Sequence, residues 1–193
     1  MIIWIIWISG AYGVGKSTLA SALVEKIGNS VVFDAEIVGN AVRGNYPDEP
    51  YGVILEDYPL WCEFNYRLLK DIHETFHRNI LVPMTMIRQS SYEKIIRRLL
   101  EDGIDTKLIV LTGTYQCIYD RLLARGEEEG CWCMKNIRMS SEGSAAIPNS
   151  YHIITDQKTV EELTRIVLAY IGDACKPARH IWQQTEQSPQ SRN

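Results

Sequence analysis

The stretch ISGAYGVGKSTL, residues 8–19, decides the fold of this 193-residue chain. Gly10, Gly15, Lys16 and Ser17 complete the pattern G-x-x-x-x-G-K-[ST], a glycine-rich turn whose backbone N–H groups surround phosphate. Glycine tolerates the positive φ angles that turn successive amides inward. A helix that follows such a turn adds a partial positive charge at its N-terminus. The stretch therefore predicts a phosphate-binding loop.

The residues on either side of the loop support this prediction over a glycine-rich turn without a ligand. The preceding run MIIWIIWI, residues 1–8, is apolar throughout, as a strand buried on both faces would be. It is too short to cross a bilayer, which takes about 20 residues. After the loop, apolar residues recur on one face of a predicted helix over residues 15–27, namely Leu19, Ala22, Leu23 and Ile27.

The residue types within the loop predict ATP and Mg²⁺ as its ligands. Lys16 is expected to reach the β- and γ-phosphates, and the Ser17 hydroxyl to ligate Mg²⁺. Gly13, Val14 and Thr18 complete the expected nucleotide-binding segment.

The composition and net charge limit which further binding partners and which cellular compartment we expect. The chain is 46% hydrophobic and 23% charged, which is typical of one domain with its own core. The net charge is −4 and no long Lys/Arg run occurs, so we expect no nucleic-acid partner. Five cysteines without a secretory signal indicate reduced thiols and a cytoplasmic location. Cys131 and Cys133 lack zinc-knuckle spacing.

Strand and helix patterns alternate along the chain, which predicts an α/β fold with a parallel sheet. The later strands are expected within residues 30–36, 80–87, 106–113 and 151–155, and helices near 38–43, 61–76, 90–102, 115–123 and 159–171. Pro83 would ordinarily move its strand to a sheet edge. Two capping boxes are predicted, Ser90 with Glu93 and Thr159 with Glu162. The core stripe expected on the second long helix consists of Trp61, Phe64, Leu68, Ile72 and Phe76.

Charged residues after two of these strands are candidates for catalysis. Asp34, with Glu36 beside it, could orient or deprotonate an acceptor hydroxyl, or Asp34 could simply cap the next helix. Arg121 and Arg125 lie four residues apart on one helix face. They could stabilise charge on a transferring phosphoryl group, together with Lys135 and Arg138, or form a solvated face.

No NKxD-type guanine motif follows the fourth strand, and the size and alternation resemble the small P-loop kinases, among them nucleoside monophosphate kinases. The resemblance implies a three-layer P-loop NTPase fold with a five-stranded parallel sheet in the order 2-3-1-4-5. It also implies an acceptor site over strands 2 and 3, which Arg43 could help to form, and a mobile lid at about residues 126–145. The expected domain covers residues 1–172, with a loosely ordered tail over residues 173–193.

A more specific resemblance rests on ISGAYGVGKS, VVFDAEIVGNAVR, DYPLWCEFNYRLL and ILVPMTMI. Together they resemble the tunicamycin-resistance ATP-binding protein family over about residues 1–170. This implies a kinase that moves the ATP γ-phosphate to a hydroxyl of tunicamycin or a related small molecule. The alternative is an ATP-dependent protein that sequesters this nucleoside antibiotic unmodified. Asp34, Arg43, Arg121 and Arg125 match the family pattern. Peripheral membrane attachment through the C-terminal tail and the oligomeric state stay open.

Three further features have alternative interpretations. Thr85 stands where many P-loop proteins carry an acidic Mg²⁺ partner, which leaves that role to Asp34, Glu36 or water. In the aromatic-rich helix Trp61, Phe64 and Tyr66 could stack on a base or line an acyl groove, or simply pack in the core. The sequence HETFH, residues 73–77, matches the zinc-protease pattern H-E-x-x-H, but no third ligand is evident and we interpret it as coincidence.

Overall fold

The computed structural model describes residues 3–48 and 50–174. Within these residues the strands are β1 (Ile5–Gly10), β2 (Ser30–Val32), β3 (Asn79–Pro83), β4 (Thr106–Thr112) and β5 (Tyr151–Ile154). The helices are α1 (Lys16–Lys26), α2 (Ala35–Arg43), α3 (Pro59–Phe76), α4 (Gln89–Tyr92), α5 (Arg98–Glu101), α6 (Tyr115–Ala124), α7 (Trp132–Lys135), α8 (Ile137–Ala145) and α9 (Val160–Ala174). A 3₁₀ turn, η1 (Leu55–Asp57), precedes α3, and a π-helical turn, η2 (Glu93–Arg97), joins α4 to α5.

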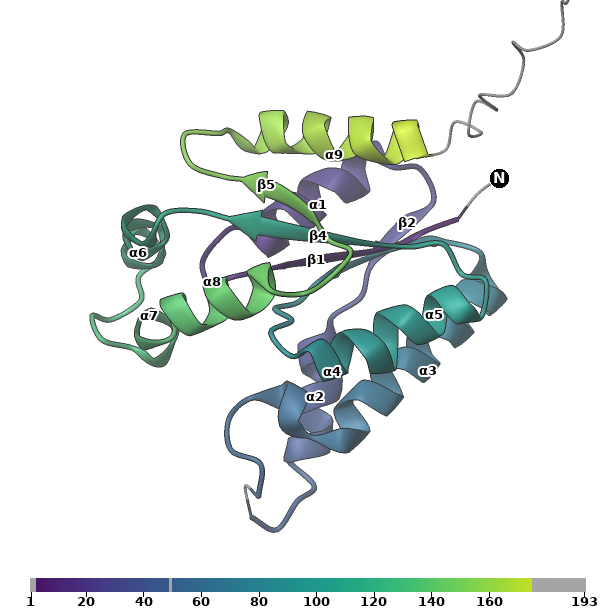
Figure 1. Cartoon of the computed structure of the whole chain (residues 1–193), viewed down its shortest axis with the longest axis horizontal. Coiled ribbons are helices and arrows are strands. Elements are labelled where there is room, and N and C mark those ends of the chain that lie inside the picture. Colours follow the sequence, from purple (N-terminus) through teal and green to yellow (C-terminus); the bar gives the residue numbers. More distant parts are fainter. Residues whose placement is uncertain (1–2, 49, 175–193) are drawn as a thin grey trace, which may run out of the picture.

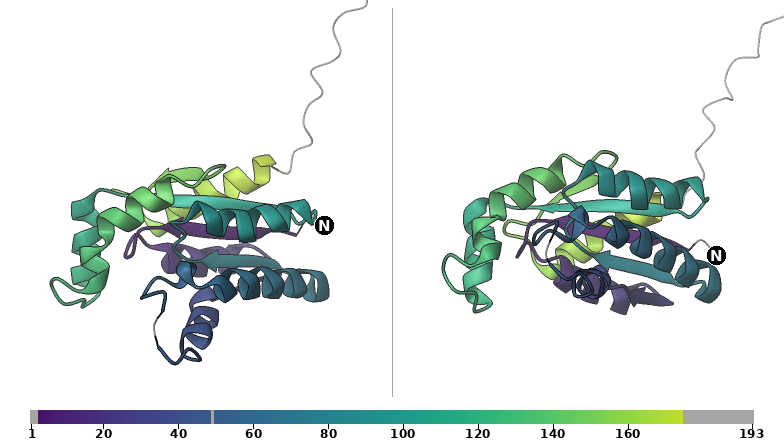
Figure 2. Two further views of the ribbon diagram at one scale, coloured as in Figure 1. Left: turned by 60° about the horizontal axis from the view of Figure 1, so that its bottom comes forward. Right: turned by 90° about the horizontal axis from the view of Figure 1, so that it is seen from below.

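The strands form one parallel sheet in the order β2-β3-β1-β4-β5, which confirms the predicted α/β class and strand order. Helices α1 and α9 cover one face, and α3, α4 and α5 cover the other (Figure 1). Figure 1 views the sheet nearly edge-on between these helical layers, and the right view of Figure 2, seen from below, shows the strands side by side behind one layer of helices. The carboxyl ends of the strands point toward α6 and α7. In open α/β sheets this edge is where ligands bind.

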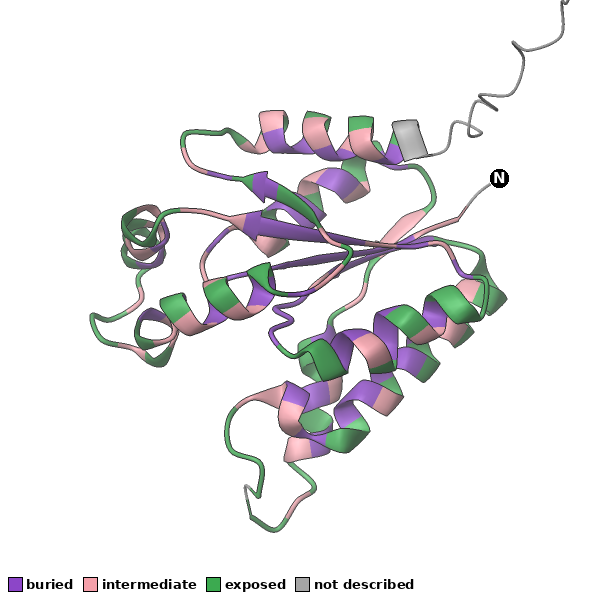
Figure 3. Cartoon of the chain, in the orientation of Figure 1, coloured by how far each residue is buried: buried purple, intermediate pink, exposed green. Residues whose placement is uncertain are grey.

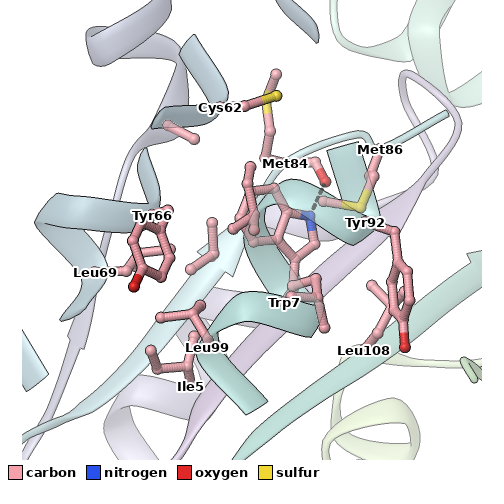
Figure 4. Close-up of a cluster of buried hydrophobic side chains, with 14 of the residues drawn as sticks. Ile5, Trp7, Cys62, Tyr66, Leu69, Met84, Met86, Tyr92, Leu99 and Leu108 are labelled. Carbon is pink, nitrogen blue, oxygen red and sulfur yellow. Dashed lines mark hydrogen bonds between the residues drawn. The ribbon is translucent and has the colours of Figure 1, made fainter. Parts of the chain in front are cut away.

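The first strand lies in the middle of the sheet and is buried along its whole length (Figure 3). Ile5 and Trp7 face one core, and Ile6 and Ile8 face the other, as the alternation of side chains in a strand requires. The Trp7 indole N–H donates to the Met84 carbonyl at 2.8 Å (Figure 4). The apolar run at residues 1–8 is thus explained by burial on both faces.

Pro83 lies in an interior strand, as the predicted strand order requires, although proline ordinarily favours a sheet edge. β3 lies between β2 and β1, and Pro83 is its last residue, opposite Ile8 of β1. The short β2 ends at Val32, which pairs with Leu81. The N–H that proline lacks therefore falls beyond the end of the β2 ladder and breaks no pairing there.

One capping box is confirmed at the start of α9. The Thr159 hydroxyl accepts from the Glu162 amide at 3.2 Å, and the Glu162 carboxylate accepts from the Thr159 amide at 2.8 Å. These reciprocal bonds satisfy donors that a helix N-terminus leaves unpaired.

The box predicted at Ser90 and Glu93 is wrong, because α4 already begins at Gln89 and Ser90 lies inside its first turn. The carboxylate that serves this helix start comes from a distant segment. Glu56 of η1 accepts from the Ile87 amide at 2.8 Å and from the Arg88 amide at 3.0 Å.

The predicted core stripe of α3 is correct only in part. Trp61 is fully buried, but Phe64 and Leu68 are 43% and 41% exposed. The buried face runs instead through Trp61, Cys62, Asn65, Tyr66 and Leu69. α3 carries apolar residues on two faces, and spacing alone cannot distinguish the face that meets the core from the one beside α2.

The C-terminal boundary differs slightly from the prediction, since α9 continues to Ala174. The remainder of the predicted loose tail, and the question of membrane attachment through it, lie outside the described residues. Among the described helices, none has both the length and the apolar character needed to cross a membrane.

Candidate nucleotide and acceptor site

The phosphate-binding loop connects the carboxyl end of β1 to the N-terminus of α1. Gly15 adopts φ 108° at the N-cap position of α1, in the left-handed region that favours glycine. Gly10 has φ 138°, and a Cβ there would collide with the Leu111 carbonyl oxygen of β4. No side chain caps α1. The first amides of a helix have no intrahelical partner, so this N-terminus can receive an anion.

Lys16 folds back onto the loop in this structure. Its ammonium donates to the Gly10 carbonyl at 3.1 Å and to the Ala11 carbonyl at 2.8 Å, and lies 5.7 Å from the centre of the Tyr12 ring. Burial lowers the pKa of Lys16 to about 8, although the nearby Glu36 carboxylate opposes that shift. Both carbonyl contacts are weaker partners for the ammonium than a phosphate oxygen would be.

A hollow of about 380 Å³ opens on this loop, and we call it the nucleotide hollow. Its lining comprises residues 13–19, Arg121, Arg125, residues 158–160 and Leu163. The predicted loop residues Gly13, Val14, Gly15, Lys16, Ser17 and Thr18 all contribute to it. The fold therefore brings both predicted arginines of α6 to the loop.

The two arginines differ in what they contact. The Arg121 guanidinium donates to the Val14 carbonyl at 3.1 Å, to the Thr155 hydroxyl at 2.8 Å and to the Thr155 carbonyl at 2.9 Å. It thereby ties the loop to the end of β5. Arg125 is exposed and pairs with Glu127 at 2.7 Å. Such an exposed pair is weak, so Arg125 is the more available of the two for a ligand.

A second, smaller hollow of about 170 Å³ adjoins the other side of the loop, and we call it the polar cavity. Its lining residues come from the loop, α2, residues 53–56, the end of β3 and α7: Tyr12, Glu36, Asn40, Arg43, Val53, Ile54, Leu55, Glu56, Met84, Thr85 and Trp132. Arg43, which the sequence predicted to help form an acceptor site, therefore lines this cavity. Its guanidinium donates to the Asn40 side chain at 3.2 Å.

Asp34 lies in neither hollow. Its carboxylate accepts from the Glu36 amide at 2.9 Å and caps α2, which is the structural role that the sequence left open for it. The α2 carboxylate that lines the polar cavity is Glu36, one turn away from Asn40 on the same helix face.

Sequence reasoning missed Glu56, the most buried carboxylate near the loop. Only 8% of this residue is exposed, and burial raises the pKa of its carboxyl group while the Ile87 and Arg88 amides oppose that shift. It lies between the helices predicted near residues 38–43 and 61–76, in a segment for which no strand or helix was predicted. An acid within apolar and aromatic neighbours, as in ILEDYPLW, is the signal that could have identified it.

Thr85 links the end of β3 to the phosphate-binding loop. Its buried hydroxyl donates to the Gly10 carbonyl at 3.0 Å. For Mg²⁺, a hard cation that prefers oxygen, the fitting donors are the exposed Ser17 hydroxyl and the Glu36 carboxylate. In the described part of the chain no group of three His, Cys, Asp or Glu side chains is arranged to bind a metal.

The segment predicted as a lid has two parts. Residues 137–145 form α8, which packs against the sheet: the Ser144 and Ser9 hydroxyls are 3.2 Å apart, and a Cβ on Gly143 would lie 2.7 Å from the Ile87 Cβ. Residues 126–136 include α7, where Trp132 contacts Tyr12 of the loop edge-on at 4.9 Å. Met134 of α7 is also buried, in the core cluster that contains Ile6 and Ile8 of β1, so α7 is anchored beside the sheet as well.

A third hollow, an apolar groove of about 920 Å³, runs between α2 and α3. Phe64 lines it, whereas Trp61 and Tyr66 are buried in the core and donate to the Ala35 carbonyl and the Asp102 carboxylate. Of the three aromatic residues considered for ligand stacking, only Phe64 is placed where a ligand could reach it.

The parallel sheet, its strand order and the loop on β1 define the fold of a small P-loop kinase. No protein-family model matches the chain, and no curated protein matches it in sequence. Several solved structures, in contrast, match the chain in fold. A tunicamycin resistance protein of Deinococcus radiodurans is 21% identical, with a TM-score of 0.72, and the match covers 88% of this chain and 96% of that one.

Two kinases show the same architecture. A gluconokinase from Sinorhizobium meliloti 1021 is 16% identical with a TM-score of 0.61, over 88% of this chain and 91% of that one. The APS kinase CysC of Mycobacterium tuberculosis, solved with AMPPNP and APS, is 15% identical with a TM-score of 0.60, and the match covers 89% of this chain and 98% of that one. At these identities the likeness concerns the fold.

Proposed function

We propose that this protein is an ATP-dependent phosphotransferase that moves the γ-phosphoryl group of ATP to a hydroxyl of a small organic molecule. The observation that carries the proposal is that two hollows adjoin the same loop. Residues 13–19 line the nucleotide hollow, and Tyr12 lines the polar cavity. A donor and an acceptor bound in these hollows would meet at Lys16.

In this proposal the loop amides and Lys16 hold the nucleotide. Lys16 would exchange the Gly10 and Ala11 carbonyls for phosphate oxygens, which carry full negative charge. Ser17 and an acid at the start of α2, Glu36 or Asp34, would hold Mg²⁺, which offsets phosphate charge when bound.

Transfer would form a bond between the acceptor oxygen and the γ-phosphorus as the bond to the bridging oxygen of ADP breaks. The hydroxyl proton would pass to the carboxylate of Glu36, which lines the polar cavity, and then to water. Arg125 would stabilise charge on the transferring group. Arg121, with its contacts to Val14 and Thr155, would position the loop.

For the acceptor we propose tunicamycin or a related nucleoside antibiotic. The proposal is supported by the sequence strings around Asp34, Trp61 and Pro83 and by the fold shared with a tunicamycin resistance protein. The test is to incubate the protein with ATP, Mg²⁺ and tunicamycin and to follow the drug by mass spectrometry. A mass gain of one phosphoryl group is expected. An unchanged drug that binds tightly would contradict transfer.

That outcome would favour the second candidate, an ATP-dependent protein that sequesters tunicamycin unmodified. The observation that favours this second candidate is the position of Thr85. Its hydroxyl donates to the Gly10 carbonyl, at a place where a fast phosphotransferase would carry an acidic residue for Mg²⁺. A sequestering protein needs nucleotide binding but no such acid.

The Lys16→Ala variant tests the nucleotide site that both candidates share. Loss of a charge-assisted contact to phosphate should weaken ATP binding by about 100-fold or more in calorimetry and abolish resistance. Lys26→Ala, at the far end of α1, is the matched control and should bind ATP as the unmodified protein does. ATP binding by Lys16→Ala at unchanged affinity would place the nucleotide elsewhere.

We further propose that the protein acts in the cytoplasm, where ATP is available. The four cysteines in the described part of the chain, Cys62, Cys117, Cys131 and Cys133, are free thiols, which suits a reducing compartment.

A further inference from the structure

The charges that line the polar cavity restrict what it can accept. Glu36 and Glu56 contribute two carboxylates, one from α2 and one from η1, and Arg43 contributes one guanidinium. The Ile87 and Arg88 amides donate to the two oxygens of Glu56 and hold its carboxylate in place at the wall of the cavity. The described lining therefore carries more negative than positive charge.

The other arginines close to this edge of the sheet, Arg88, Arg121 and Arg125, do not line the polar cavity. Arg88 forms a two-point pair with Asp57 at 3.1 Å, and Arg121 ties the loop to β5. Arg125 lines the nucleotide hollow. Arg43 itself donates to Asn40. Binding of a phosphate or carboxylate group typically uses arginines that present two parallel N–H donors, and the polar cavity offers one such residue against two acids.

The negative charges of Glu36 and Glu56 also shift the pKa of a residue in the phosphate-binding loop. Burial is the main reason that the pKa of Tyr12 is raised, and Glu56 and Glu36 add to it because a phenolate would be repelled by both. Glu36 also favours the Lys16 ammonium. A negative group bound beside Tyr12 would meet the same repulsion as the phenolate.

The remainder of the lining is aromatic and apolar. The Tyr12 and Trp132 rings contact each other edge-on at 4.9 Å, and Val53, Ile54 and Met84 add apolar surface. Trp132 is 39% exposed, so part of its ring is free to cover a flat ligand.

We propose that the acceptor is a hydroxyl compound without negative charge, uncharged or cationic, that presents a ring to Tyr12 and Trp132, and that Glu36 and Glu56 exclude phosphorylated or carboxylated metabolites. This inference rests on the proposed phosphotransferase function and names its substrate class. Exclusion by like charge is an efficient way to discriminate between otherwise identical ligands.

Matched acceptor pairs test the inference with the full-length protein, ATP and Mg²⁺. The pairs are uridine and uridine monophosphate, glucosamine and glucosamine 6-phosphate, and glucose and glucuronate, each followed by ADP release and by mass spectrometry. We expect transfer to uncharged or cationic members, with kcat/KM at least about tenfold above that of the anionic partner. Equal or better transfer to the anionic members would overturn the inference and leave the phosphotransferase proposal standing. Transfer to no member, with ATP bound, would overturn the inference that this class of hydroxyl compounds is accepted, whereas the tunicamycin experiment tests the phosphotransferase proposal separately.

The Glu36→Gln variant tests the source of the discrimination. It removes one carboxylate from an exposed position on α2 and should reduce the preference for the uncharged member several-fold. Because Glu36 is also a proposed Mg²⁺ ligand and proton acceptor, the preference of this variant and of its control is measured as the ratio of acceptor dissociation constants in calorimetry with AMPPNP bound, which needs no turnover. Glu101→Gln changes the net charge equally, but lies on α5 just before β4 begins, at the opposite edge of the sheet. The control should keep the full preference. Equal preference in both variants would show that Glu36 does not set the specificity.

Discussion

At the residue scale, Lys16 is the side chain whose state depends most on the nucleotide. Without a ligand its ammonium is buried against two backbone carbonyls, and burial lowers its pKa to about 8. Bound phosphate would favour the ammonium and hold that pKa higher, since opposite charge stabilises the protonated form. Nucleotide binding should therefore take up a proton once the pH exceeds about 8.

This linkage predicts that ATP affinity is nearly constant from about pH 7 to 8 and then falls with rising pH, by up to about tenfold per pH unit. Above pH 8 the free protein holds a neutral amine that must gain a proton before it can pair with phosphate. Titration calorimetry in buffers of different ionisation enthalpy would measure both the affinity and the proton uptake. The Lys16→Arg variant keeps its charge at all these pH values, so any binding that it retains should lack the decline. A decline of the same size in that variant would assign the titration to another group.

At the element scale, Glu56 joins η1 to the start of α4, across 31 residues of sequence. Its two oxygens satisfy two amides at a helix N-terminus where the chain offers no local cap. An unpaired amide in a buried position costs far more than an exposed pair contributes. The neighbouring Asp57 makes such an exposed pair with Arg88.

Glu56→Ala should therefore lower the free energy of unfolding by about 1–3 kcal/mol, because it leaves the Ile87 and Arg88 amides without an acceptor. Asp57→Ala, one residue away, should cost no more than about 1 kcal/mol. Urea denaturation of both variants would measure the difference. Equal losses would mean that the Glu56 contacts contribute little beyond surface charge.

At the scale of the whole molecule, Arg121 connects three parts of the fold: α6, the phosphate-binding loop and the end of β5. Arg125, one turn further along, makes only an exposed pair with Glu127. The two arginines look equivalent in sequence, but their tertiary contacts give them separate roles, one in positioning the loop and one available to a ligand.

We expect Arg121→Ala to lose about 1–3 kcal/mol of stability, since the Val14 and Thr155 carbonyls lose their donor, and to weaken ATP binding as the loop loosens. Arg125→Ala should keep its stability within about 1 kcal/mol. If Arg125 contacts the transferring phosphoryl group, its loss should instead lower kcat by about 10³-fold or more. Thermal unfolding and turnover, measured on both variants, separate the two roles. A stable Arg121→Ala, or an unstable Arg125→Ala, would reverse the assignment.

Some of these features follow from neighbouring residues alone. The loop at Gly10–Ser17, the buried strand before it and the cap of α9 at Thr159 and Glu162 depend on residues close together in sequence, and the structure contains each. Local chemistry determines them, because a positive φ angle, a helix N-terminus and a strand buried on both faces each require particular residue types at fixed spacing.

Other features depend on which segments meet, and spacing could not reveal them. Glu56 caps a helix that begins 33 residues later, and Phe64 and Leu68 lie beside α2 instead of in the core. Pro83 is tolerated because a neighbouring strand is short. The sequence by itself therefore determined the α/β class and the phosphate-binding loop. Only the tertiary structure decided which carboxylates line the polar cavity and which arginine stays available, because burial and pairing arise from contacts between distant parts of the chain.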